Sequence, residues 1–366
     1  MRHQVGAAVA VAVVASLVYA GTTAARPAGR DDSPDRTPAG TATTDVRVMT
    51  WNVCGESGTC RAKSDPGRQA TQIAELARGA NTDAVLLQEV CGDEAKNDSR
   101  YDSGKTASKS LVTLVQERLG GDWRIAFTPY LRPAEDRFGT TAPSGPGATA
   151  EYPPRYVNPR ATSEFRCRGA GLAGVQGLAV AVRGTIGERA EYELPSPDTG
   201  LWLKVLCARR ATGTPVRFCT SHFTPQSQDV DRRAGFSYRA EQVQRLRELI
   251  GGGADTVFGG DFNSRPPDDP SNTADKAILA PLYAGYRECE QGHGGARRGT
   301  GTMWANDQPT KRTDRKYDYL FGAASFTSCE VLSATALATW SDHLPLVGTV
   351  PVTTPKIIAG PDPLAR

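Results

Sequence analysis

The strongest constraint on the fold of this chain is a set of short apolar runs that each end in a polar or acidic residue. Such runs lead into Asn52, into Glu89 and into Asp261. A carboxylate after a buried apolar strand is costly unless it is paired, hydrogen-bonded or bound to a cation. A single strand-end Asn or Asp is more often a turn former, but Glu is a poor turn residue. Three such endings therefore indicate that the strands share a common rim.

The spacing of apolar residues predicts sheets with helices outside them. Short apolar runs predict strands at Val46–Asn52, Ala84–Glu89, Gly177–Val182, Trp202–Ala208, Val216–Ser221, Thr256–Gly260, Tyr317–Phe321 and Leu346–Val350. Apolar residues at three-to-four spacing predict helices at Arg68–Arg78, Lys109–Leu119 and Tyr238–Ile250. Strands dominate and do not alternate regularly with helices, so the pattern indicates mixed sheets and not a regular βαβ array.

The organisation of the 366-residue chain indicates export. Arg2 precedes an apolar run from Val5 to Ala20, which is shorter than the roughly 20 residues that a membrane span needs. We therefore expect a cleaved signal peptide over residues 1–25 and a flexible linker, rich in Pro, Asp, Thr and Ala, over 26–44. A single domain is expected over 45–352 and a tail over 353–366. The protein is predicted to be secreted and extracellular, without a stable membrane anchor after cleavage.

The charge balance excludes one class of function. The chain has 43 Lys and Arg residues against 40 Asp and Glu residues, a formal net charge of +3. A protein that coats nucleic acid non-specifically would carry a bulk basic field, and this chain has none. If the partner is a polyanion, the attraction must be local.

The eight cysteines are expected to form disulfides, because export places the chain in an oxidising compartment. The expected pairs are Cys54 with Cys60, Cys207 with Cys219, Cys91 with Cys167, and Cys289 with Cys329. Sequence alone leaves other pairings of eight cysteines open. A zinc site is the alternative, although none of the spacings is of the close Cys-x-x-Cys type.

The segment Gly259-Gly260-Asp261-Phe262-Asn263 is a candidate site. Its glycines allow close approach of the backbone to a neighbour or a ligand, and Asp261 and Asn263 project to the same side of an extended segment. A carboxylate beside an amide can orient or deprotonate a water molecule. An Asx-type turn is an equally good interpretation of this segment alone.

Two histidines lie in suggestive settings. His222 follows a predicted strand, and His343 follows Asp342, which offers a metal or metal-water ligand beside an imidazole. Asp318, an acid inside an apolar run, is a candidate partner that would keep His343 protonated. The alternative is that Asp318 pairs with a cation of the basic cluster at 311–316. His293 lies in a Gly-rich loop and is expected to be solvated.

Six short motifs occur in a fixed order from Asn52 to His343. They are Thr50-Trp51-Asn52, Leu87-Gln88-Glu89-Val90, Thr220-Ser221-His222, Gly260-Asp261-Phe262-Asn263-Ser264, Tyr317-Asp318-Tyr319-Leu320 and Ser341-Asp342-His343. In this respect the chain resembles the endonuclease/exonuclease/phosphatase superfamily, and within it the pancreatic-type deoxyribonucleases. The resemblance implies an α/β fold, a four-layer αββα sandwich of two mixed β-sheets flanked by helices, with the active site at one edge.

The resemblance also implies roles for the motif residues. The metal group would be Glu89, Asn52 and Asp342, binding Mg²⁺ directly or through water, with Mn²⁺ or Ca²⁺ as alternatives. The catalytic group would be Asp261, which orients or deprotonates the attacking water; Asn263, which holds the phosphate or the nucleophile; Asp318, which fixes and charges His343; and His222 with His343, which donate to phosphoryl oxygens. The implied reaction is in-line hydrolysis of a phosphate ester by water.

The implied substrate is a phosphodiester, and the leading expectation is a monomeric, metal-dependent nuclease that acts on DNA or RNA. Many nuclease members have a basic residue two positions after the metal-binding Glu, where this chain has Cys91. The basic and aromatic residues between Tyr130 and Arg168 could contact a phosphate backbone or a base, or could form a solvated loop. The alternatives are a phosphatase or phospholipase C acting on phosphoinositide or sphingomyelin headgroups, and an inactive binding module.

Overall fold

The computed structural model describes residues 41–54, 65–92, 109–130, 175–197, 202–229, 236–272, 275–291, 296–305, 308–333, 337 and 340–355. The expected signal peptide, most of the expected linker, His293 and the segment from 131 to Arg168 lie outside the described residues, so the expectations for them stay predictions. Among the described helices, none is long and apolar enough to cross a membrane.

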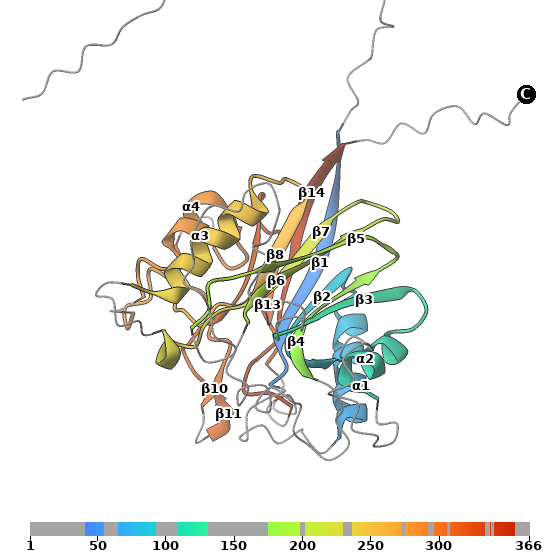
Figure 1. Ribbon diagram of the computed structural model, residues 1–366, viewed down its shortest axis with the longest axis horizontal. Helices are drawn as coiled ribbons and strands as arrows, with labels where there is room; N and C mark the ends of the chain where they lie inside the picture. The colour runs from blue at the N-terminus through green and yellow to red at the C-terminus, as the bar shows by residue number, and fades with distance from the viewer. Residues whose placement is uncertain are drawn as a thin grey trace, which may run out of the picture. The chain divides into compact units, whose positions relative to one another are not determined.

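The domain is built on two six-stranded mixed sheets (Figure 1). In the first sheet the strand order is β13 (Ser328–Val331), β14 (Leu346–Pro355), β1 (Thr41–Asn52), β2 (Ala84–Gly92), β4 (Val175–Arg183) and β3 (Trp123–Pro129). In the second sheet it is β5 (Ile186–Glu193), β6 (Lys204–Arg210), β7 (Arg217–His222), β8 (Thr256–Asp261), β12 (Asp318–Gly322) and β9 (Arg287–Glu288). A separate two-stranded sheet pairs β10 (Trp304–Ala305) with β11 (Gln308–Arg312).

The helices cover the outer faces of the two sheets, which gives four layers (Figure 1). Helices α1 (Pro66–Gly79) and α2 (Leu111–Leu119) pack on the first sheet, and α3 (Tyr238–Ile250) and α4 (Ala280–Gly285) pack on the second. Side chains at their N-caps explain where the longer helices begin: the side chains of Asp65, Ser110 and Ser237 each accept a hydrogen bond from a backbone N–H of the first turn. The predicted αββα sandwich is therefore confirmed.

Alternation along the strands separates two apolar cores. In β1, Val46 and Val48 face the second sheet, whereas Met49 and Trp51 face α1. Because β2 and β4 are covered on both faces, they read as nearly continuous apolar runs and not as alternating ones.

One polar link joins the two sheets within this apolar interior. Gln88 Nε2, on β2, donates to Thr50 Oγ1 (3.1 Å) and to Thr220 Oγ1 on β7 (2.8 Å). All three side chains are buried. The link lies one residue before Glu89 and two residues before His222 and Asn52, so it fixes the separation of the sheets at the edge where these residues meet.

The structure differs from the predicted elements in where the first strand begins and in several short or edge elements. The first strand begins at Thr41, four residues before the expected domain start, because Thr41–Thr44 pair with Val352–Pro355 of β14. The paired ends of β1 and β14 extend past the core. The Thr-rich end of β1 is exposed, so it lacks the apolar pattern of a buried strand. Sequence reasoning also missed β3, β5, β9, β10, β11, β13 and α4, which are short or form sheet edges.

The described disulfides agree with two of the expected pairs. Cys207 is bonded to Cys219 across β6 and β7, and Cys289 is bonded to Cys329. Cys54 and Cys91 are disulfide-bonded as well. Their expected partners, Cys60 and Cys167, lie outside the described residues, so those two pairings stay predictions.

A buried ionic cluster anchors the start of β12. Lys316 Nζ lies 3.2 Å from Glu288 Oε1 and also contacts Glu290 Oε2, and the Lys316 and Glu288 side chains are fully buried. Burial is the largest influence on Glu288; with the nearby charge of Glu290, and opposed by Lys316, it raises the pKa of Glu288 to about 7. The cluster thus contains two carboxyl groups and one ammonium group, and it lies two residues before Asp318 in the chain.

We predict that Glu288 makes the stability of the protein depend on pH. Its pKa is raised in the folded state, so its contribution is fully present below the unfolded pKa of 4.5 and is lost as the pH rises through about 7. The loss amounts to about 3 kcal/mol. Denaturant unfolding measures the free energy of unfolding at pH 5 and pH 8. Between these two pH values it should fall less in Glu288→Gln than in the wild type. Glu248→Gln, on the exposed face of α3, is the control and should behave as the wild type; equal pH dependence in all three proteins would contradict the prediction.

Candidate active site at the edge of the sandwich

Strand register in the second sheet brings three predicted residues together. β7 and β8 run parallel with His222 paired to Asp261, and β12 runs antiparallel to β8 with Asp318 paired to Asp261. The three residues are therefore neighbours on adjacent strands at one end of the sheet. Asn263 follows two residues after Asp261.

The first sheet contributes the other predicted residues to the same edge. β1 ends at Asn52, which pairs with Gln88 of the parallel strand β2, so Glu89 lies beside it. β14 is antiparallel to β1, so Asp342 and His343 precede β14 at the end where β1 finishes. Two hydrogen bonds fix this approach: Trp51 Nε1 donates to the His343 carbonyl (3.0 Å), and Ser341 Oγ donates to the Asn52 carbonyl (2.7 Å).

Asp261 is at the centre of the assembled side chains. Its Oδ2 accepts from Asn52 Nδ2 (3.0 Å) and lies 3.5 Å from His222 Nε2 and 3.6 Å from His343 Nε2. Its Oδ1 accepts from the backbone N–H of Asn263 (2.9 Å). The residue is only 1% exposed, so its carboxylate depends on these partners.

His343 is held by Asp318. The distance from His343 Nδ1 to Asp318 Oδ2 is 2.8 Å, and both side chains are buried. Burial opposes protonation of the imidazole, but the charges of Asp318 and Asp261 outweigh it and raise the pKa of His343 well above its usual value. The ring presents its Nε2 to Asp261, and burial raises the pKa of Asp318 as well. The alternative partner for Asp318 is not adopted: Lys316 pairs with Glu288 and Glu290 instead.

The predicted metal group lies around Asn52. Asn52 Nδ2 donates to Glu89 Oε1 (2.9 Å) as well as to Asp261, while its Oδ1 accepts from the backbone N–H of Cys54 (2.9 Å). In this arrangement the amide nitrogen of Asn52 positions the two carboxylates. Glu89 is half-buried at a β-bulge with φ +53°, and Asp342 is also half-buried. Carboxylate oxygens such as theirs are the ligands that a hard divalent cation prefers.

A second acidic group is a hydrogen-bonded unit. Ligand atoms of Asp261, Asp318 and His343 lie within 4.8 Å of one another, all buried. Within this group, His343 Nδ1 and Asp318 Oδ2 share a hydrogen bond, and Asp261 lies beside the two residues.

Asn263 faces His222. Asn263 Nδ2 donates to the Phe223 carbonyl (2.9 Å) and lies 3.0 Å from His222 Nε2. Its backbone has φ +45°, the left-handed region that Asn tolerates better than most residues. The Asn263 backbone N–H donates to Asp261 Oδ1, so the segment forms an Asx-type turn, and this turn brings Asn263 next to the assembled side chains.

Sequence reasoning missed three residues that support the site. Tyr130, at the end of β3, places its hydroxyl 3.2 Å from the Glu89 backbone nitrogen and 3.1 Å from His222 Nδ1. Thr302 Oγ1 accepts from the backbone N–H of Asp318 (3.1 Å). Arg239 is the third. Tyr130 follows β3, a strand that the apolar pattern did not predict, and Thr302 and Arg239 do not follow a strand that leads to the site, so the pattern that revealed Asn52 or Asp261 does not reveal them.

Arg239, on α3, anchors the loop that contains Asn263. Its guanidinium donates to the Asn263 carbonyl (2.6 Å) and bonds Asp275 (2.9 Å) and Asp229 (2.8 Å). The side chain is 5% exposed. It therefore joins the segment after His222, which carries Asp229, to the segment after Asp261.

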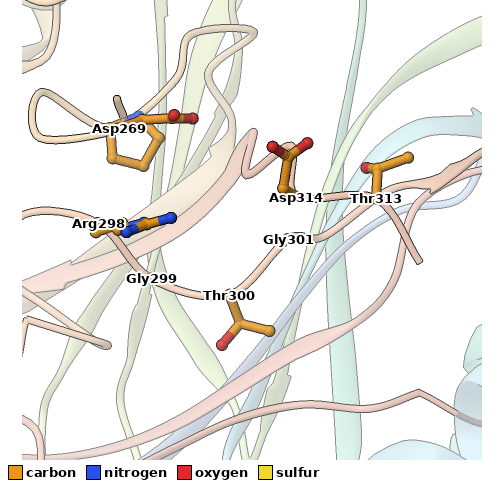
Figure 2. A pocket seen from close by; sticks show the side chains of 8 residues that line it. Asp269, Arg298, Gly299, Thr300, Gly301, Thr313 and Asp314 are labelled. Atoms are coloured by element: carbon orange, nitrogen blue, oxygen red, sulfur yellow. The ribbon is translucent and has the colours of Figure 1, made fainter. Parts of the chain in front are cut away.

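A pocket of about 450 Å³ adjoins the centre. It is lined by Pro266, Asp269, Arg298, Gly299, Thr300, Gly301, Thr313 and Asp314 (Figure 2). Pro266 lies three residues after Asn263, and Gly301 precedes Thr302, which bonds Asp318. Among the residues that line the pocket, Arg298 and Asp314 have exposed side chains, and Asp269 is paired with Arg265 (3.1 Å).

We predict that Arg239→Met destabilises the protein by about 3–5 kcal/mol, because it leaves Asp229 and Asp275 buried without their cation. Arg239→Lys keeps the charge but lacks the forked geometry of the guanidinium, so its free energy of unfolding should fall by a smaller amount. Equilibrium unfolding in urea measures both. Arg245→Met is the matched control on the same helix, where the partner Glu248 is exposed, and its effect should stay below about 1 kcal/mol. Equal losses for Arg239→Met and Arg245→Met would contradict the prediction.

Comparison with solved structures shows the same fold in several bacterial proteins. An endonuclease/exonuclease/phosphatase from Beutenbergia cavernae has 19% identity and a TM-score of 0.53, with 84% of this chain and 72% of that chain covered. A family protein from Bacteroides thetaiotaomicron has 15% identity and a TM-score of 0.52, with 85% and 99% covered. One from Leptotrichia buccalis has 11% identity and a TM-score of 0.52, with 83% and 98% covered.

Proteins of curated function give no significant match to this chain. The model of the Endonuclease/Exonuclease/phosphatase family matches residues 49–343, a range that includes every predicted site residue. The chain therefore belongs to the Endonuclease/Exonuclease/phosphatase family, whose members are hydrolases of phosphate esters.

Proposed function

We propose that this protein is a secreted, metal-dependent phosphodiesterase that cleaves nucleic acid. The observation that carries the proposal is the position of Asp261: one buried carboxylate oxygen lies within 3.6 Å of the Nε2 atoms of both His222 and His343. A carboxylate between two imidazoles, one of them charged, suits the activation of a water molecule next to a phosphoryl group.

In the proposed reaction, a water molecule attacks phosphorus in line with the leaving oxygen. Asp261 takes a proton from the water as the new P–O bond forms. The bond from phosphorus to the leaving oxygen breaks, and that oxygen takes a proton from solvent. His343, held as an imidazolium by Asp318, stabilises the negative charge that builds on the phosphoryl oxygens.

Glu89 and Asp342 would hold the divalent cation, with Mg²⁺ as the ion that these oxygen ligands suit best. Such an ion, when bound, polarises a phosphoryl oxygen and neutralises developing charge. Asn52 keeps Glu89 and Asp261 apart and oriented, because its amide nitrogen donates to both carboxylates.

The pocket beside the centre supports a nucleic-acid substrate. Its lining offers a guanidinium and threonine hydroxyls, which contact phosphate and sugar in nucleic-acid complexes, beside the carboxylates of Asp269 and Asp314. Arg298 is the exposed cation there, while the neighbouring Arg297 is paired with Asp268 (2.8 Å). We therefore propose that Arg298 contacts a phosphate next to the scissile one.

Export is supported by the N-terminal sequence and by the cysteines. The apolar run after Arg2 is typical of a signal peptide. Six described cysteines are disulfide-bonded, which suits an oxidising compartment. Detection of the processed protein in culture medium tests this part of the proposal.

The central test is hydrolysis by the purified mature chain with and without a chelator. We expect phosphodiesterase activity that is lost on chelation and restored by Mg²⁺. Asp261→Asn should lower kcat by about 10²- to 10⁴-fold, since it removes the base. Asp255→Asn changes the same residue type just before the opposite end of β8 and should keep the wild-type rate. Activity that survives chelation, or an active Asp261→Asn protein, would refute the proposal.

A substrate panel separates the alternatives. Nicking of supercoiled DNA or degradation of RNA supports the nuclease. Release of phosphate from inositol phosphates, or hydrolysis of sphingomyelin, in the absence of nuclease activity would favour a phosphatase or phospholipase C. No turnover of any of these substrates would indicate a binding module.

We predict that Arg298→Ala weakens nucleic-acid binding without impairing the chemistry. An exposed ion contact is worth up to about 1 kcal/mol, so KM for DNA should rise by up to about fivefold with kcat unchanged. Loss of one phosphate contact should also reduce the slope of log KM against log salt concentration by about 1. Arg297→Ala is the adjacent control and should leave the slope unchanged; an unaltered slope in Arg298→Ala would exclude a phosphate contact.

A further inference from the structure

We propose that Tyr130 is a positioning residue that, together with the Asn263 carboxamide, holds His222 as a neutral imidazole with its proton on Nδ1. The inference rests on the proposed function for its catalytic consequence. The tautomer of His222 can be measured without any enzyme activity.

The hydroxyl of Tyr130 lies between the two sheets. Its oxygen is 3.2 Å from the backbone nitrogen of Glu89 in the first sheet and 3.1 Å from His222 Nδ1 in the second. Tyr130 is 1% exposed, and its ring meets the His222 ring edge to face at 5.8 Å. One phenol therefore touches both the predicted metal ligand and an imidazole of the centre.

The orientation of Asn263 determines which nitrogen of His222 is protonated. Asn263 Nδ2 lies 2.9 Å from the Phe223 carbonyl oxygen and 3.0 Å from His222 Nε2. If the amide were reversed, its oxygen would face the carbonyl oxygen at that distance, and two acceptors would oppose each other. The amide nitrogen therefore donates one hydrogen to Phe223 and the other to His222, so Nε2 is an acceptor.

An imidazole that accepts at Nε2 has its proton on Nδ1. That proton is donated to the Tyr130 oxygen, which also accepts the N–H of Glu89. A phenol oxygen has two lone pairs and can accept both hydrogen bonds. The alternative, in which Tyr130 donates to Nδ1, would put a proton on Nε2 against the amide hydrogen of Asn263.

The two histidines of the site thus differ in function, although both end in Nε2 close to Asp261. His343 is bonded to a carboxylate and is charged, whereas His222 is bonded to a phenol and is neutral. With both amide hydrogens of Asn263 engaged, its Oδ1 is left as an acceptor. An acceptor can bind the hydrogen of a water molecule but not a phosphate oxygen, so Asn263 would act on the nucleophile.

The test is NMR spectroscopy of the full mature chain without metal and with ¹⁵N-labelled histidine. The mature chain has few histidines, which makes assignment by His222→Gln and His343→Gln practical. Long-range ¹H–¹⁵N correlations distinguish the two neutral tautomers and the imidazolium. We expect His222 as the Nδ1–H tautomer in the wild type. A wild-type His222 protonated on Nε2, or on both nitrogens, would overturn the inference.

Tyr130→Phe removes only the hydroxyl. We expect His222 to lose the single Nδ1–H tautomer and, if the enzyme is active, kcat to fall about three- to tenfold with KM nearly unchanged. Tyr286→Phe is the matched control: its partly buried hydroxyl donates to the Gly251 carbonyl (2.6 Å) after α3, away from the site. It should match Tyr130→Phe in thermal stability but keep the tautomer and kcat.

The spectrum separates this inference from the proposed function. An inactive protein with the Nδ1–H tautomer would refute the function and leave the inference intact. An active enzyme in which Tyr130→Phe keeps both the tautomer and kcat would refute the inference alone.

Discussion

The site depends on one constraint, which is that the Asp261 carboxylate is buried between two sheets. A carboxylate that is 1% exposed must be surrounded by donors, and the structure supplies them from both sheets. Asn52 donates from the first sheet, the Asn263 backbone donates from the turn after β8, and His343, from the segment before β14, places its Nε2 3.6 Å from the carboxylate. The αββα sandwich is what allows donors so far apart in the chain to converge.

The supporting network explains how the site tolerates unfavourable backbone conformations. Glu89 and Asn263 both have positive φ, which costs a non-glycine residue on the order of 1–2 kcal/mol. Each is held by groups that meet it from other elements: Tyr130 and Asn52 at Glu89, and Arg239 and Phe223 at Asn263. Gln88, between Thr50 and Thr220, fixes the separation of the sheets just behind them.

Much of the fold and of the site could be predicted from local sequence. Strands buried on both faces, such as β2 and β4, have continuous apolar runs, and Tyr238–Ile250 was predicted with the bounds that the structure shows. Edge strands such as β5 and β13 were missed because their exposed residues are polar. The predicted site residues meet at one edge, since strand ends on a shared rim leave a signal in the sequence.

The sequence by itself determined the family and the chemical types at the site: carboxylates, amides and imidazoles at strand ends, in a fixed order. It could not determine which partner each group has, because partners are set by strand register and by contacts between residues far apart in the chain. Only the tertiary structure decided that Asp318 pairs with His343 while Lys316 pairs with Glu288 and Glu290. It also decided that Asn52 presents nitrogen to its neighbours and that Tyr130 bonds His222. Hydrogen bonds depend on distance and direction in space, and the sequence specifies these only through the fold.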